Sequence, residues 1–421
     1  MVLFPSDLRC LCKGLHLEVG IRSPTLFKFQ HHSQFLIDMK SNHSLPSSRD
    51  KLLFTPGPLT TSSTVKQAML KDAGSWHWEF SAKVAWIRSE LLRIAGLSVE
   101  GGWECVLMQG SGTFGVEAIF QTGVSPEGKV AVLTNGAYGE RMLEMLKRAR
   151  IPAAVIRSDE STPPSIDALE SILASDKEIT HVAAVHCETT TGILNPIAEY
   201  GEVARKYGKI YVVDAMSSFG AIPIDFEDCR IDYLVSSANK CIEGVPGFAF
   251  VFCRRPVLEA TSGWSRSLSL DLLGQLRGFD KNGQFRFTPP THSLLAFEQA
   301  LIELEQEGGI DGRHSRYRSN HARLLSGMRG LGFSSFLEPE VQSPIITAFR
   351  CPRDPAFSFE DFYRRLSDRG MIIYPGKLTQ ADTFRIGNIG RLFPAEMEQL
   401  VQAIEASLID AGVTLPVTHP E

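Results

Sequence analysis

Apolar runs of strand length alternate with helical stretches through the middle of this chain, and this alternation restricts the possible folds most strongly. The runs are Glu104–Met108, Lys129–Thr134, Ala153–Ile156, His181–His186, Lys209–Val213, Tyr233–Ser236 and Gly247–Cys253. Helical stretches such as Gly139–Arg150, Ser165–Ala174 and Ile197–Tyr207 separate most of them. The pattern predicts an α/β fold with a mostly parallel, seven-stranded sheet covered by helices on both faces.

The chain has 421 residues, more than the roughly 250–300 that one hydrophobic core usually serves. We predict a large domain over residues 51–310, leaving open that its first residues pack with a smaller α/β domain over 311–421. In that smaller domain a helical stretch through Met328 precedes Ile345–Phe349, Phe359–Arg369, Met371–Tyr374, Phe384–Gly387 and a final helix near Pro394–Leu408. Residues 1–50 lack periodicity, which is typical of a disordered extension or a targeting segment.

Composition narrows the classes of function. The net charge of −5 gives no general attraction to nucleic acid or to an anionic membrane. No apolar run reaches the ~18–20 residues of a membrane span. Eight cysteines are scattered through the chain, which favours a reducing compartment, the cytoplasm, over a disulfide framework. The alternative is a mitochondrial location through the N-terminal extension. Cys10 and Cys12 lack the spacing of a zinc site, so no metal is predicted.

A glycine-rich loop, Gly110–Gly115, follows the first of these strands and opens a helix. Its spacing matches a dinucleotide-binding loop, but the next strand ends in Asn135 and not in the carboxylate that would bind a ribose. Backbone N–H groups and the helix dipole, with the hydroxyls of Ser111 and Thr113, form a site that suits a single phosphate. An ordinary strand-to-helix turn is the alternative.

Two strands end in residues that suit one cofactor. Asp214 ends one strand and Lys240 follows another, and lysine is the residue of Schiff-base chemistry. Pyridoxal 5′-phosphate (PLP) requires a lysine for its aldehyde, an acid for its pyridine nitrogen and a phosphate site, and Tyr138 is available to stack on its ring. Taken singly, Asp214 could be a helix cap, Lys240 a surface charge and Tyr138 a core aromatic. Together they indicate PLP.

A series of motifs extends this interpretation from about Lys51 to Leu408. They are Phe54–Pro58, Gln109–Thr113, Asn135–Gly139, His186–Gly192, Val213–Gly220, Ser237–Cys241, Ser265–Leu272, Arg286–His292 and Phe384–Gly390. In this order they resemble the class V aminotransferases of PLP fold type I.

The resemblance implies roles in binding the cofactor. Lys240 would form the Schiff base and then carry the proton between the substrate carbon and the cofactor, while Asp214 would keep the pyridine nitrogen protonated. Thr189 would bond the phenolic oxygen of the cofactor, with His186 or Glu188 sharing that role. The remaining implied contacts are Ser111, Gly112 and Thr113 on the phosphate, Tyr138 on the ring and, from a second subunit, Thr288 on the phosphate. The last of these implies a homodimer with shared sites.

The resemblance also implies substrate contacts. Arg385 would bind the carboxylate of the keto acid, Gly57 would let the backbone approach the substrate, and Arg266 is a candidate for a phosphonate group. For Gly57 a plain structural turn, and for Arg266 a surface salt bridge, are the alternatives. His77 stands where the family usually has an acidic residue, which bears on phosphonate specificity if that segment lines the pocket.

The implied reaction transfers the amino group of 2-aminoethylphosphonate to pyruvate, giving phosphonoacetaldehyde and L-alanine in phosphonate degradation. The first alternative is a serine- or alanine-type aminotransferase acting on glyoxylate or pyruvate on the same scaffold. A PLP lyase or cysteine desulfurase would need a nucleophilic thiol, for which Cys351 is the candidate in the C-terminal domain. The presence of Lys240, Asp214 and Arg385 together argues against a third alternative, a non-catalytic binding protein.

Overall fold

The fold is described from a computed structural model, which covers residues 50–378 and 381–419. The predicted N-terminal extension and the Cys10 and Cys12 pair lie outside these residues, apart from Asp50. Within the described residues no helix has both the length and the apolar character needed to cross a bilayer. The six cysteines of this part of the chain are free thiols.

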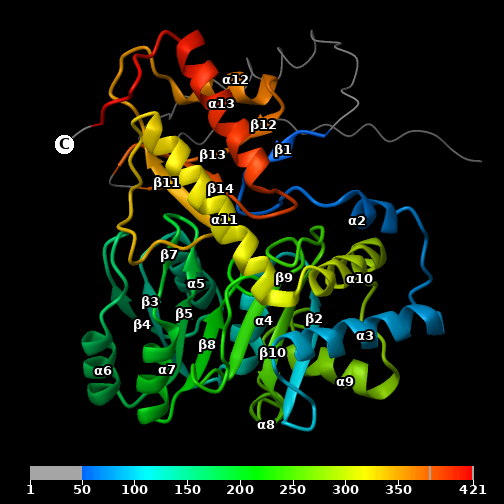
Figure 1. The fold of residues 1–421 in the computed structure, drawn as a ribbon. Helices are drawn as coiled ribbons and strands as arrows, with labels where there is room; N and C mark the ends of the chain where they lie inside the picture. The colour runs from blue at the N-terminus through cyan, green and yellow to red at the C-terminus, as the bar shows by residue number, and fades with distance from the viewer. Residues whose placement is uncertain (1–49, 379–380, 420–421) are drawn as a thin grey trace, which may run out of the picture. The chain divides into compact units, whose positions relative to one another are not determined.

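Each of the seven predicted runs forms a strand of one sheet, so the predicted fold class is confirmed (Figure 1). The strands are β2 (Trp103–Gln109), β3 (Lys129–Thr134), β4 (Ala153–Arg157), β5 (Ile179–Val185), β8 (Ile210–Asp214), β9 (Tyr233–Ser237) and β10 (Phe248–Arg254), in the order β2-β10-β9-β8-β5-β3-β4. Only β10 runs antiparallel to its neighbours. Its connection from β9 is too short for the crossover of about a dozen residues that a parallel pair needs.

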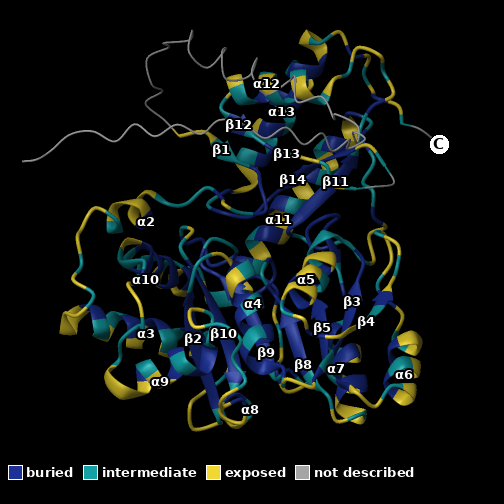
Figure 2. Ribbon diagram, turned by 180° about the vertical axis from the view of Figure 1, so that it is seen from behind, coloured by how far each residue is buried: buried dark blue, intermediate teal, exposed yellow. Residues whose placement is uncertain are grey.

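Right-handed crossovers distribute the helices over both faces of the sheet. The chain moves outward from β3 to β4 through α5 (Ala137–Arg148), and then inward through α6 (Ile166–Ser175) and α7 (Ile197–Lys206). Crossovers of the same handedness that run in opposite directions along the sheet place their helices on opposite faces. Therefore α5 and α7 lie on opposite faces, and α4 (Gly112–Gly123) lies on the same face as α5 (Figures 1 and 2). The direction changes between β3 and β5, and open α/β sheets bind ligands beyond the strand ends at such a point.

The sheet is buried between these layers, as the dark strands in Figure 2 show. Phe250 and Phe252 of β10 are fully buried and pack against Phe219 with ring centroids 5.7 and 4.9 Å apart. The β2 edge is covered by α3 (Trp78–Ile94) and α9 (Leu272–Asn282). The remaining helices of this part of the chain are α2 (Ser63–Ala68), α8 (Arg255–Glu259) and α10 (Thr291–Gln306), and β6 (Cys187–Glu188) pairs with β7 (Ile193–Leu194).

A second apolar core forms around Phe384, between a three-stranded antiparallel sheet and the helices beside it. Its elements are β11 (Ile346–Arg350), β13 (Tyr374–Pro375), β14 (Thr383–Gly387), α11 (Gly309–Gly330), α12 (Phe359–Asp368) and α13 (Pro394–Asp410). The predicted single strand Met371–Tyr374 is divided, because β12 (Met371–Ile372) pairs with β1 (Leu52–Leu53) whereas β13 pairs with β14. The first described strand thus belongs with this second core.

Buried charges join α11 to the loop that carries Lys240. The Glu243 carboxylate accepts hydrogen bonds from Arg316 at 2.7 Å and from the Tyr317 hydroxyl at 2.6 Å. The Arg316 guanidinium also donates to the Gly390 carbonyl at 2.6 Å. Because removing one member of a buried ionic network leaves the others uncompensated, these contacts fix the loop after β9 against the second core.

Candidate active site

A cavity of about 280 Å³ opens at the carboxyl ends of the sheet strands. The predicted site residues on its lining are Gly57, Ser111, Gly112, Thr113, Tyr138, Asp214 and Lys240. They come from the starts of α4 and α5, the end of β8, the loop after β9 and the segment that follows β1. Two further predicted site residues, Thr189 and Arg385, are not among the residues that line this cavity.

Lys240 lies on the cavity wall with its ammonium held by backbone oxygens. It donates to the carbonyl of Pro56 at 2.6 Å and to that of Gly57 at 3.3 Å. Burial lowers the pKa of Lys240 below its usual range, against the opposing effect of Tyr138 and nearby acidic groups. A lysine with a lowered pKa more readily supplies the free amine that attacks a carbonyl.

Gly57 is required by the close approach of the backbone to Lys240. Its φ is +100°, and a Cβ there would lie 2.5 Å from the Asn239 carbonyl oxygen and 2.8 Å from Cδ of Lys240. Only glycine can adopt this positive φ and leave room for the Asn239 carbonyl and the Lys240 side chain. The backbone at Gly57 therefore packs directly against Lys240.

Asp214 ends β8 with its carboxylate buried below the cavity. One oxygen accepts the Met216 N–H at 2.9 Å. Burial raises the pKa of Asp214 to about 6, although Lys240 and Arg141 pull it down. Among the described residues no cationic side chain forms an ion pair with this carboxylate, so a cationic ring nitrogen would supply the missing partner.

The start of α4 forms the predicted phosphate site. Ser111 is the N-cap residue, and its hydroxyl makes no capping hydrogen bond. Gly112 is buried, and a Cβ there would collide with the sulfur of Met216. A free hydroxyl, exposed backbone N–H groups and the positive end of the helix dipole all favour an anion at this point.

Tyr138 is held by the first turn of α5. Its N–H donates to the buried Glu188 carboxylate at 3.0 Å, and the N–H of Gly139 donates at 3.3 Å. The side chain of Thr189 helps to lower the pKa of the Tyr138 phenol. Glu188 is therefore engaged in capping α5, whereas His186 is buried with its Nδ1 atom unpaired among the described residues. Burial lowers the pKa of His186 to about 4, so its imidazole is neutral.

Arg141 is a cavity residue that the sequence analysis missed. Its guanidinium donates to the Thr113 hydroxyl at 3.3 Å and lies 4.8 Å from the centroid of the Tyr138 ring. It thus connects the two helix starts that line the cavity. The available signal was its position one turn after Tyr138 on the same helix.

Arg385 lies in the middle strand of the small sheet, with its side chain buried. Its Nε donates to the Pro375 carbonyl at 3.0 Å and its Nη1 to the Thr189 carbonyl at 2.7 Å. Burial lowers the pKa of Arg385. Because both partners are neutral carbonyls, the guanidinium is fixed in place while its remaining donors stay available for a carboxylate.

The structure does not bring Arg266 to this cavity. Its guanidinium donates to the carbonyls of Val124 at 2.7 Å and Ser125 at 2.9 Å. These carbonyls follow the last residue of α4, a helix of 12 residues whose first turn forms the phosphate site, so about 18 Å of helix separates the two ends. Arg266 caps the C-terminus of α4 in this structure and does not line the cavity of its own protomer, so its role as a phosphonate ligand stays a prediction.

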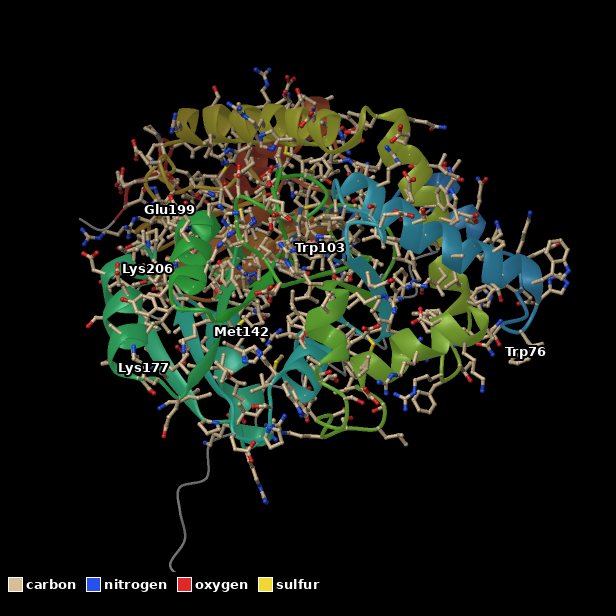
Figure 3. All side chains as sticks on the ribbon, turned by 90° about the horizontal axis from the view of Figure 1, so that it is seen from below. Trp76, Trp103, Met142, Lys177, Glu199 and Lys206 are labelled. Atoms are coloured by element: carbon tan, nitrogen blue, oxygen red, sulfur yellow. The ribbon has the colours of Figure 1, made fainter. Side chains whose placement is uncertain are left out.

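Thr288 and His77 also lie outside the cavity lining. The carbonyl of Thr288 accepts a hydrogen bond from the side chain of Gln109, just before the glycine-rich loop. His77 is the N-cap of α3, where its Nδ1 accepts the Glu79 N–H at 3.3 Å. Figure 3 shows the neighbouring Trp76 at the periphery, well away from Met142 of the cavity wall. The segment with His77 therefore does not line the pocket of its own protomer.

These features fit PLP. The free hydroxyl and glycine at the start of α4 suit its phosphate, the unpaired buried Asp214 suits its ring nitrogen, and Lys240 suits its aldehyde. The three groups line a single cavity, with Tyr138 beside them.

Comparison with known proteins agrees with this fit. The family model of the class V aminotransferases matches residues 73–383. A curated 2-aminoethylphosphonate–pyruvate transaminase from Salmonella heidelberg (strain SL476) is 52% identical over 364 residues, covering 86% of this chain and 99% of the relative. A transaminase of the same name from Salmonella typhimurium has the same identity and coverage.

Solved structures share the fold at lower identity. Ureidoglycine–glyoxylate aminotransferase from Bacillus subtilis has a TM-score of 0.80 at 20% identity, covering 88% of this chain and 96% of its own. Alanine–glyoxylate aminotransferase from Nostoc has a TM-score of 0.78 at 24% identity, with coverages of 88% and 98%. With the matched family model and the cavity built around Lys240, these findings establish that the chain belongs to the class V aminotransferases and is a PLP-dependent enzyme.

Proposed function

We propose that this enzyme transfers the amino group of 2-aminoethylphosphonate to pyruvate, giving phosphonoacetaldehyde and L-alanine, and so acts in phosphonate degradation. The observation that carries the proposal is the 52% identity, over 99% of their length, to transaminases named for this reaction. The amine donor and the keto acid would use one cavity in turn, as the single lysine on its wall requires.

Lys240, Asp214 and Tyr138 have different roles in the proposed reaction. When bound, PLP supplies an aldehyde for the amine and a ring that accepts electrons from the substrate carbon. Lys240 holds and moves the proton at its amine nitrogen, within reach of the Pro56 carbonyl. The Asp214 carboxylate keeps the ring nitrogen cationic, and Tyr138 excludes water from one face of the ring.

Arg385 receives the carboxylate of pyruvate in this proposal. The bonds to Pro375 and Thr189 orient its guanidinium before the substrate arrives, which reduces the entropy lost on binding. A planar guanidinium also binds a carboxylate through two parallel hydrogen bonds.

The functional unit of this proposal is a homodimer. Exposed apolar side chains support it, with Trp76, Trp78 and Phe287 exposed to 79%, 71% and 41%. The carbonyl of Thr288, the residue after Phe287, accepts a hydrogen bond from Gln109 of the same subunit. In the proposed dimer, Thr288 would contact the cofactor phosphate held by the other subunit, as the family resemblance implies. Light scattering tests the mass, and a monomer at micromolar concentration would overturn this part of the proposal.

The alternative of a cysteine desulfurase finds no support at Cys351. Its N–H donates to the Asp382 carbonyl at 2.9 Å, and burial raises the pKa of its thiol to about 11. A thiol with a raised pKa carries too little thiolate to be a good nucleophile.

An absorbance spectrum of the purified holoenzyme tests the proposed function. Addition of 2-aminoethylphosphonate without keto acid should remove the visible band of the bound cofactor, and pyruvate should then restore it. A band that ignores this donor but is removed by alanine or serine would favour the serine- or alanine-type enzyme. The absence of a visible band after reconstitution with PLP would contradict the assignment of the cavity.

We place the enzyme in the cytoplasm, because its scattered cysteines suit a reducing compartment. A fusion of residues 1–50 to a fluorescent protein tests the mitochondrial alternative. Import of the fusion would overturn this location.

A further inference from the structure

Lys377, on the segment after β13, approaches the cavity from the small sheet. Its Nζ atom lies 5.4 Å from the centroid of the Tyr138 ring, and its side chain is exposed. Two residues earlier, the Pro375 carbonyl accepts the Nε–H of Arg385. One short segment therefore both accepts a hydrogen bond from Arg385 and brings the Lys377 cation to Tyr138.

The other cations around Tyr138 are each held by hydrogen bonds to the protein. Lys240 donates to Pro56, Arg141 donates to Thr113 at the phosphate site, and Arg385 donates to two carbonyls. In contrast, no carboxylate among the described residues forms an ion pair with Lys377. Its charge is therefore available to a ligand.

The Lys377 charge lies close to Tyr138, which is a residue of the cavity wall. Burial opposes ionisation of the Tyr138 phenol, but the charges of Lys240 and Lys377, with the side chain of Thr189, lower its pKa overall. An anion bound near this ring would be stabilised by the same charges.

The two proposed substrates present different anions. In pyruvate the carboxylate is attached directly to the reacting carbon, and it carries one charge. In 2-aminoethylphosphonate one further carbon separates the phosphonate from the reacting carbon, and the phosphonate carries up to two charges. The single fixed guanidinium of Arg385 matches the pyruvate carboxylate in position and charge. The phosphonate extends farther from the reacting carbon and needs an additional cation.

We propose that Lys377 binds the phosphonate of the amine donor, next to Arg385, and that it is not needed for pyruvate. This inference rests on the proposed function, and it makes Lys377 the residue that distinguishes the phosphonate donor from the carboxylate acceptor. Because lysine presents a point charge on a flexible stem, it suits the tetrahedral phosphonate and can withdraw when the smaller acceptor binds.

The test compares Lys377→Gln and Lys377→Arg with the wild-type holoenzyme, and with Lys147→Gln as a control on the last turn of α5. The visible band reports the half-saturating concentration of each substrate separately. Calorimetry measures the binding of two unreactive analogues, ethylphosphonate and propionate, to the same holoenzymes. The bound cofactor occupies the phosphate site in these experiments, so the analogues report on the substrate site.

Lys377→Gln should raise the half-saturating donor concentration and the Kd of ethylphosphonate by about tenfold, as expected for one lost charge-assisted hydrogen bond. The values for pyruvate and propionate should stay within about twofold, since those contacts remain with Arg385. Lys377→Arg should recover most of the donor affinity, and Lys147→Gln should resemble wild type. Equal weakening of both substrates, or an unchanged Kd for ethylphosphonate, would overturn the inference. A wild-type enzyme that ignores 2-aminoethylphosphonate but binds ethylphosphonate through Lys377 would overturn the proposed function alone.

Discussion

The Lys240 ammonium donates a 2.6 Å hydrogen bond to the carbonyl oxygen of Pro56, 184 residues earlier in the chain. Pro56 belongs to the segment that leaves the second core at β1, whereas Lys240 follows strand β9 of the seven-stranded sheet. The reactive amine is therefore positioned by backbone from one core and by a strand from the other. A change in this crossing segment should act on catalysis directly.

Gly57→Ala tests this contact. The new methyl would lie 2.5 Å from the Asn239 carbonyl oxygen at a φ of +100°, so we expect kcat to fall by more than about tenfold and the free energy of unfolding by about 1–3 kcal/mol. Steady-state kinetics and urea unfolding measure the two. Gly96→Ala is the matched control, because its φ is +69° with no atom within 4 Å of the added Cβ. Equal losses of kcat in both variants would refute the role of the contact with Lys240.

Asp214 should make the stability of the apoenzyme depend on pH. Its pKa of about 6 lies above the ordinary value of 3.8, so the folded state binds a proton more tightly than the unfolded state. The buried charge therefore costs stability above pH 6, on the order of 3 kcal/mol, and this cost disappears as the pH falls toward 4. Asp214→Asn should unfold at higher urea than wild-type apoenzyme at pH 7.5, with a smaller difference at pH 5. A difference that does not change with pH would exclude the raised pKa.

Asp214→Asn, which should stabilise the apoenzyme, should lower the activity of the holoenzyme. Loss of the carboxylate removes the partner of the cationic ring nitrogen, and we expect kcat to fall by a factor of about 100 or more. Retention of near-normal kcat by Asp214→Asn, measured at saturating PLP, would show that another group holds the ring nitrogen.

Arg141→Gln should weaken PLP binding. The guanidinium lies 3.3 Å from the Thr113 hydroxyl at the phosphate site, and loss of one charge-assisted contact predicts a Kd for PLP about tenfold higher. Equilibrium dialysis of the apoenzyme measures this. Arg148→Gln, on the same helix and paired with Glu144 at the surface, is the control and should leave the Kd unchanged. Identical affinities in the two variants would remove Arg141 from the phosphate site.

Most of the sheet could be predicted from the sequence because its strands are buried on both faces. The run Lys129–Thr134 is apolar over nearly its whole length, and its predicted bounds are those of β3. The direction of β10 could not be read from the same kind of run, because it depends on the length of the connection and not on the strand. Asp214 and Lys240 were found for the same reason as the strands, since each comes where a buried run stops.

Arg141 and Lys377, which reach Tyr138 from elements other than the strand ends, were not predicted from the sequence. Arg141 lies one turn after Tyr138 on α5, but this spacing alone does not show that both side chains face the cavity. Lys377 reaches Tyr138 from the segment after β13, and no spacing in the chain encodes that approach. The position of Arg266 could not be predicted, because a motif shows that an arginine is present but not which end of a helix it contacts. Tertiary packing brings it to the C-terminal end of α4.

Arg385→Lys should separate the fixed geometry of the guanidinium from its charge. Lysine keeps the charge but cannot donate to the carbonyls of Pro375 and Thr189 while also presenting two parallel donors to a carboxylate. We expect the KM for pyruvate to rise by about tenfold to a hundredfold, and the free energy of unfolding to fall by about 1–3 kcal/mol because the buried Thr189 carbonyl and the partly buried Pro375 carbonyl lose a donor. Arg350→Lys, on the neighbouring strand β11, is the control and should change neither quantity appreciably. If Arg385→Lys kept the KM for pyruvate while losing stability, Arg385 would be a structural residue that fixes Pro375 and Thr189, and another residue would have to bind the carboxylate.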